Sequence, residues 1–195
     1  MSVWLPELPP TAAWRHRDAR LGFEVLFVRH DRGCLRLEGH STAVEEDEAW
    51  AIRYDLTVDE RWVTRSAHVF AQSAQGVHEV RLEADGTGAW QIDGKAAPQL
   101  DGCLDVDLEA SACTNALPIH RLGLSVGGRS DAPAAYVRAP NLRVERLEQA
   151  YARLPDDGER ARYEYVAPAF DFSAVLTYDR FGFVLDYPGI AVRVA

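Results

Sequence analysis

Residues 49–84 contain three consecutive runs in which apolar and polar side chains alternate: A-W-A-I-R-Y-D-L-T-V (49–58), W-V-T-R-S-A-H-V-F-A (62–71) and V-H-E-V-R-L-E-A (77–84). Alternation with a period of two is typical of a strand that is buried on one face only. The polar segments between the runs, D-E-R and Q-S-A-Q-G, are suited to tight turns. This stretch therefore predicts an antiparallel meander.

The same pattern continues on both sides of the meander. Upstream, apolar residues alternate around H-D-R-G (30–33), which predicts a hairpin. Downstream, a short strand is expected around Trp90, and further strands are expected at 102–108, 134–138, 141–150, 161–166, 172–179, 182–187 and 190–194. Residues 111–124 have apolar spacing compatible with a helix. Residues 143–153 fit a helix or a bulged strand, and we favour the strand because no strong helix cap precedes them.

The sum is an all-β or mainly β protein of about a dozen antiparallel strands with one or two short helices. A sheet of that size must curl, split or close, so we expect a curved antiparallel sheet or an open or partly closed β-barrel. The polar segment P-D-D-G-E-R (155–160) is too short to separate two domains. Residues 1–195 are therefore predicted to form a single domain.

Composition limits the function classes. The net charge of −9 disfavours nucleic acid as a partner. The chain lacks an apolar run long enough to span a membrane, and it begins without the pattern of an export signal, so a soluble, cytoplasmic protein is expected. Cys34, Cys103 and Cys113 match no zinc or redox spacing, and no cofactor or metal is predicted.

The candidate functional residues concentrate in residues 85–122. If residues 101–107 form a regular strand, alternation places Asp101, Cys103, Asp105 and Asp107 on one face. If they face solvent, they are the polar side of a half-buried strand. If they face a cavity, repulsion and burial raise a carboxyl pKa, and the group could serve as an acid/base pair or bind sugar hydroxyls. Metal binding by these aspartates together with His120 is disfavoured, because the glycine and the final glutamate of a calcium loop are missing.

Three further residues accompany the aspartates. Asn115 and Arg121, in T-N-A-L-P-I-H-R-L (114–122), could orient a polar head group, or they could form a turn and a surface ion pair. Trp90 lies between two turns and could stack on a sugar ring. Common catalytic templates such as G-x-S-x-G and H-E-x-x-H are absent, so no catalytic residue is assigned beyond the three aspartates as candidates.

Four motifs together resemble the bacterial putative glycolipid-binding family, over nearly the whole chain. They are D-G-T-G-A-W (85–90), L-D-G-C-L-D-V-D-L (100–108), T-N-A-L-P-I-H-R-L (114–122) and F-G-F-V-L-D-Y-P-G (181–189). The resemblance implies a curved, unclosed or barrel-like sheet with a hydrophobic concave face. His120 stands where the family commonly has a second arginine, which implies weaker or pH-dependent head-group binding.

The resemblance implies a protein that binds an amphipathic ligand such as a glycolipid, with the acyl part on the concave face. The ligand-binding residues expected from these motifs are Trp90, Asp105, Asp107, Asn115, His120, Arg121 and Tyr187. Two alternatives remain open. One is an enzyme acting on a carbohydrate or small molecule through paired aspartates, and the other is a non-catalytic structural or interaction protein. Exposed edge strands would also allow a homodimer.

Overall fold

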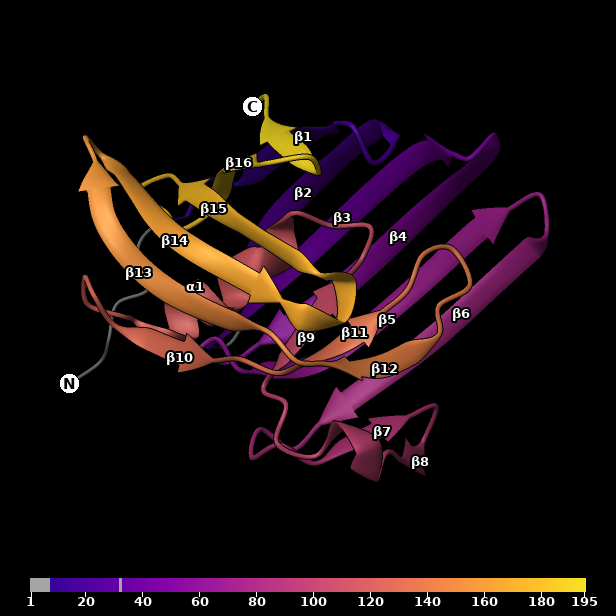
Figure 1. Cartoon of the computed structure of the whole chain (residues 1–195). Helices are drawn as coiled ribbons and strands as arrows, with labels where there is room; N and C mark the ends of the chain where they lie inside the picture. The colour runs from indigo at the N-terminus through magenta and orange to yellow at the C-terminus, as the bar shows by residue number, and fades with distance from the viewer. Residues whose placement is uncertain (1–7, 32) are drawn as a thin grey trace.

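Most of the chain forms one strongly curved sheet (Figure 1). The computed structural model describes residues 8–31 and 33–195. The sheet has 14 strands, which in chain order are β1 (Thr11–His16), β2 (Leu21–Asp31), β3 (Cys34–Glu45), β4 (Glu48–Val58), β5 (Thr64–Ser73), β6 (Gly76–Ala84), β7 (Trp90–Ile92), β8 (Lys95–Ala96), β10 (Arg129–Asp131), β13 (Ala150–Asp157), β14 (Arg160–Ala167), β15 (Phe172–Tyr178), β16 (Val184–Tyr187) and β17 (Ala191–Arg193).

The sheet is open at both ends. Its strand order is β10-β13-β14-β15-β16-β17-β1-β2-β3-β4-β5-β6-β7-β8, and all its pairings are antiparallel. The pairing of β1 with β17 joins the two halves of the chain at the middle of the sheet. Within the described residues, β8 and β10 do not pair with each other, so the curved, unclosed sheet predicted from the alternation is confirmed.

The meander and its neighbouring hairpin lie where the alternation places them. The turn between β2 and β3 contains Gly33, whose φ of +85° is readily adopted only by glycine. In β3, β4 and β5, alternate side chains are buried on the concave side, as at Leu37, Leu56 and Val69. The intervening polar residues lie on the outer face. Half-burial of each strand therefore explains why a period of two was visible in the sequence.

A second, smaller sheet lies inside the curve. It consists of β9 (Asp105–Leu108), β11 (Ala134–Val137) and β12 (Val144–Leu147), in the order β12-β11-β9. Here the sequence prediction needs two corrections. The strand predicted at 102–108 begins only at residue 105, and it pairs with β11 in parallel rather than antiparallel. All residues of β9 and β11 are buried, because elements cover both faces of the small sheet, so alternation carries no information there.

The helix predicted within residues 111–124 is confirmed as α1 (Ala116–Leu122), which also lies inside the curve (Figure 1). It ends at Gly123, in the left-handed conformation. Short 3₁₀ helices η1 (Pro98–Leu100), η2 (Cys113–Asn115) and η3 (Pro168–Phe170) complete the elements. None of the helices in the described part of the chain has the length and apolar character needed to cross a bilayer.

Two turns of the large sheet have the same geometry. In the turn after β4, the Asp59 carboxylate accepts hydrogen bonds from the backbone N–H groups of residues 61 and 63, and in the turn after β15, Asp179 does the same for residues 181 and 183. Trp62 (φ +63°) and Gly182 (φ +76°) occupy equivalent positions. His120, near the end of α1, contacts both turns: its ring stacks on Trp62 at 3.7 Å, and its Nε2 is 2.9 Å from the Phe181 carbonyl oxygen.

Candidate functional site

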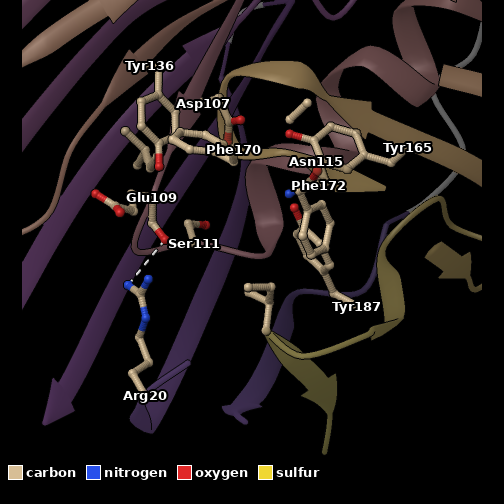
Figure 2. A pocket seen from close by; sticks show the side chains of 13 residues that line it. Arg20, Asp107, Glu109, Ser111, Asn115, Tyr136, Tyr165, Phe170, Phe172 and Tyr187 are labelled. Carbon is tan, nitrogen blue, oxygen red and sulfur yellow. Dashed lines mark hydrogen bonds between the residues drawn. The ribbon is translucent and has the colours of Figure 1, made fainter. Parts of the chain in front are cut away.

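A cavity of about 180 Å³ lies where the two sheets meet (Figure 2). One side is formed by the concave face of β14 and β15, and the other by β9, β11 and the segment that follows β9. The turns before β2 and after β16 close the end, through Arg20 and Ile190. The lining divides into a polar group, Arg20, Asp107, Glu109, Ser111 and Asn115, and an aromatic group, Tyr136, Tyr165, Phe170, Phe172 and Tyr187.

The size of the cavity limits what it can hold. A cavity of about 150 Å³ accommodates one benzene-sized ring, and sites for drug-sized ligands are usually about 300–1,000 Å³. The cavity therefore fits one ring or a small head group. The concave face is hydrophobic, and core side chains of the small sheet and α1, such as Val106, Leu108 and Leu117, pack against it.

Asp107 is the ionisable group at the centre of the polar lining. It is 8% exposed, and its carboxylate accepts a hydrogen bond of 3.0 Å from the Thr114 hydroxyl. Burial raises the pKa of Asp107 to about 6, and the nearby charges of Asp105 and Glu109 act in the same direction. Asp107 can therefore exchange a proton near neutral pH.

Ser111 is held on the floor of the cavity by a buried carboxylate. Glu24 is fully buried and accepts hydrogen bonds from the Tyr54 hydroxyl (2.6 Å), the Ala112 backbone N–H (2.7 Å) and the Ser111 hydroxyl. Burial raises the pKa of Glu24, and these hydrogen bonds oppose that rise. The network fixes the segment after β9 against β2 and β4, and it thereby positions the polar side of the cavity.

The aromatic side is a packed cluster. The rings of Tyr165, Phe172 and Tyr187 contact one another, with centroids 5.9–6.1 Å apart. Tyr136 packs against Phe170, with centroids 5.5 Å apart. Phe170 is 41% exposed, so this side reaches the protein surface. An amphipathic ligand could leave the cavity over this ring.

Three of the seven predicted ligand-binding residues line this cavity: Asp107, Asn115 and Tyr187 (Figure 2). Asp105 and Arg121 do not. They form a buried, two-pronged ion pair, with Nε–Oδ1 and Nη2–Oδ2 distances of 2.9 and 2.5 Å. Burial opposes the charge of Arg121, but the hydrogen bonds to Asp105 outweigh it and raise the pKa of the guanidinium. This pair anchors α1 to β9.

Trp90 and His120 also lie outside the cavity lining. Trp90 is 3% exposed and donates a hydrogen bond of 2.8 Å to the Cys103 carbonyl, so almost no ring surface is available for stacking on a sugar. His120 lies between the two equivalent turns, and burial lowers its pKa to about 4. We therefore leave both residues out of the proposed site.

The three candidate catalytic aspartates do not converge. Asp101 is exposed in the turn after η1, Asp105 is bound to Arg121, and Asp107 alone lines the cavity. Their separation follows from the shortness of β9, because Asp101 precedes the strand and is not on its face. Among the described residues, no group of three or more His, Cys, Asp or Glu side chains is placed to hold a metal ion.

Sequence reasoning missed most of the aromatic lining and Arg20. The alternation Y-E-Y at 163–165 could have indicated inward-facing tyrosines. No sequence pattern indicated Arg20, because it lies in a short turn between β1 and β2 and is brought to the cavity only by tertiary packing.

Comparison with known proteins identifies the family. The sequence profile of the family described as "putative glycolipid-binding" matches residues 11–193. The chain belongs to this family. A crystal structure of a DUF1089 family protein from Pseudomonas aeruginosa is similar to this chain, with a TM-score of 0.74 and 37% sequence identity over 88% of this chain and 92% of that chain.

A second solved structure is more distant. It is a β-barrel-like protein of the domain of unknown function DUF1849 from Brucella abortus, with a TM-score of 0.49 and 8% identity over 94% of this chain and 92% of that chain. No curated protein matches the sequence significantly.

Proposed function

We propose that the cavity binds the head group of an amphipathic molecule such as a glycolipid, and that the apolar part leaves over Phe170. The family supports a glycolipid as the ligand. The cavity volume of about 180 Å³ supports a ring-sized head group and argues against an enclosed acyl chain.

One observation carries this proposal: polar hydrogen-bonding groups and aromatic rings converge on a single ring-sized space. Asp107, Asn115 and Ser111 offer carboxyl, amide and hydroxyl groups, which suit sugar hydroxyls. The opposite wall offers the rings of Tyr165, Phe172 and Tyr187, and aromatic rings can pack against the apolar face of a sugar. A site of this composition binds a molecule that is polar at its edges and apolar on its face.

Native mass spectrometry of the purified protein, followed by lipid extraction, tests the proposal. We expect a stoichiometric adduct that is lost on denaturation and consists of one lipid class. Phe172→Ala, in the cavity, should lose the adduct. Phe70→Ala, a matched change on the outer face of β5, should retain it. A wild-type protein free of enriched lipid would contradict the function, and equal retention by both variants would contradict the site.

The remaining expectations about the molecule stay predictions. They are a cytoplasmic location and a homodimer, and sedimentation analysis of the purified protein would test the latter. The enzyme alternative loses its basis in paired aspartates, because only Asp107 of the three candidates faces the cavity.

A further inference from the structure

Arg20 is a buried cation with few partners. Its side chain is 5% exposed and lines the cavity (Figure 2). Its Nε is buried and has no hydrogen-bond partner among the described residues. One guanidinium nitrogen donates a long hydrogen bond of 3.3 Å to the Glu109 carbonyl oxygen, and Nε is 3.7 Å from the Glu45 carboxylate. A guanidinium has five N–H donors, so most of its capacity is unused.

The surroundings leave the cavity as the direction for a further partner. The Trp50 ring lies 5.4 Å from the guanidinium carbon and covers one side of it. The turn that carries Arg20 is fixed, because residues 17 and 19 donate backbone hydrogen bonds to residues 190 and 189. The guanidinium is therefore held in place rather than free to swing into water, and an arginine held this way binds a carboxylate or phosphate at low entropic cost.

Arg20 supplies the positive charge in a cavity lining that also contains the carboxyl groups of Asp107 and Glu109. Burial lowers the pKa of His16 to about 4, and the positive charge of Arg20 contributes to that lowering. Across the cavity, the pKa of Asp107 is about 6, so this carboxyl can take up a proton and avoid repelling an anionic ligand. Charge-assisted hydrogen bonds of this kind are roughly twice as strong as neutral ones.

We propose that the head group bound in this cavity carries an oxyanion, a carboxylate or phosphate on a ring-sized sugar, and that Arg20 binds it. This inference rests on the proposed function and adds the ligand's charge to it. Asp107, Asn115 and Ser111 then bind the hydroxyl groups of the same ring. The ligand class is an acidic glycolipid rather than a neutral one.

Two probes that differ in a single substituent of the sugar ring test the inference: octyl β-glucuronide carries a carboxylate, and octyl β-glucoside carries an uncharged hydroxymethyl group in its place. Binding is measured by isothermal titration calorimetry below the micellar concentration. We expect the wild type to bind the glucuronide at least about tenfold more tightly, as one charge-assisted hydrogen bond allows. Arg20→Met should remove this preference, and Arg20→Lys should retain part of it.

The matched control is Arg53→Met. Arg53 lies on the outer face, with its guanidinium 5.6 Å from the Phe70 ring, an arrangement comparable to Arg20 over Trp50. It should leave the preference for the glucuronide unchanged. Thermal unfolding tests whether each variant is folded. If Arg20→Met does not fold, the inference is tested with Arg20→Lys, which should show a reduced preference for the glucuronide.

The outcomes separate this inference from the proposed function. Equal affinity for the two probes, or a preference that survives Arg20→Met, overturns the inference while the proposed function stands. Binding of neither probe contradicts the proposed function itself. Free glucuronate and inorganic phosphate are titrated as two further ligands. If either binds as tightly as octyl glucuronide, the site recognises a free anion, and the lipid part of the inference is wrong.

Discussion

At the scale of single residues, Asp105 and Asp107 differ sharply although only Val106 separates them. Asp105 forms a two-pronged ion pair with Arg121, whereas the side-chain hydrogen-bond partner of Asp107 within residues 8–31 and 33–195 is the Thr114 hydroxyl. Burial raises the pKa of both carboxyls; Arg121 opposes the rise at Asp105, whereas the pKa of Asp107 reaches about 6 with only the Thr114 hydrogen bond opposing it. The first carboxylate is structural, and the second is available to a ligand.

The stability of the protein should depend on the protonation of Asp107. Because the folded-state pKa of about 6 exceeds the usual 3.8, this group favours folding below about pH 4, and the benefit is lost as the pH rises through 6. Asp107→Asn removes this dependence. The free energy of unfolding of the wild type, relative to the variant, should fall by about 2–3 kcal/mol between pH 4 and pH 7 in urea titrations. A constant difference across that range would contradict the expectation.

Breaking the ion pair should cost more than removing both partners. Asp105→Asn leaves the buried Arg121 without its counter-charge, and we expect the free energy of unfolding to fall by about 3–5 kcal/mol. The double variant Asp105→Asn/Arg121→Met removes the stranded cation and should recover part of the loss. Chemical unfolding of Asp105→Asn, Arg121→Met and the double variant measures the coupling free energy between the two residues. Additive losses would show that the two residues act independently.

At the scale of elements, the two equivalent turns place different residues at the same backbone position. Gly182 adopts a positive φ at ease, and a Cβ there would lie 2.4 Å from Nε2 of His120. Gly182→Ala should therefore lower the free energy of unfolding by at least about 2 kcal/mol, from backbone strain and the clash together. Gly158→Ala is the control, because its φ is also positive (+61°) but its added Cβ meets nothing within 4 Å. Equal losses in urea unfolding would exclude a role for the clash.

The elements also show how far sequence alone could reach. Strands β3 to β6 were predictable because water covers one face, so polar and apolar residues alternate. Strands β9 and β11 are buried on both faces, and their parallel pairing depends on contacts far apart in the sequence. Asp107, Asn115 and Tyr187 were found because they lie in distinctive motifs, whereas Arg20 and Phe172 reach the cavity only through tertiary packing.

At the scale of the whole molecule, the pairing of β1 with β17 makes the two halves one sheet, and we expect them to unfold together. The chain itself supplies the probe, since all five tryptophans lie at or before residue 90, whereas far-UV circular dichroism reports on both halves. Unfolding curves from tryptophan fluorescence and circular dichroism should coincide. Separate midpoints would divide the predicted single domain of residues 1–195 into two units.

The placement of His120 between the two equivalent turns also constrains the order of folding. Its hydrogen-bond partner Phe181 is 61 residues away, and Trp62 lies in the other half of the sheet. Because these contacts join α1 to two turns that are far from it in the sequence, we expect them to form late in folding. His120→Ala should therefore accelerate unfolding and leave the refolding rate nearly unchanged in stopped-flow experiments. The His120 imidazole would then slow the unfolding of the assembled sheet, so that it determines the lifetime of the native state and not the rate of folding.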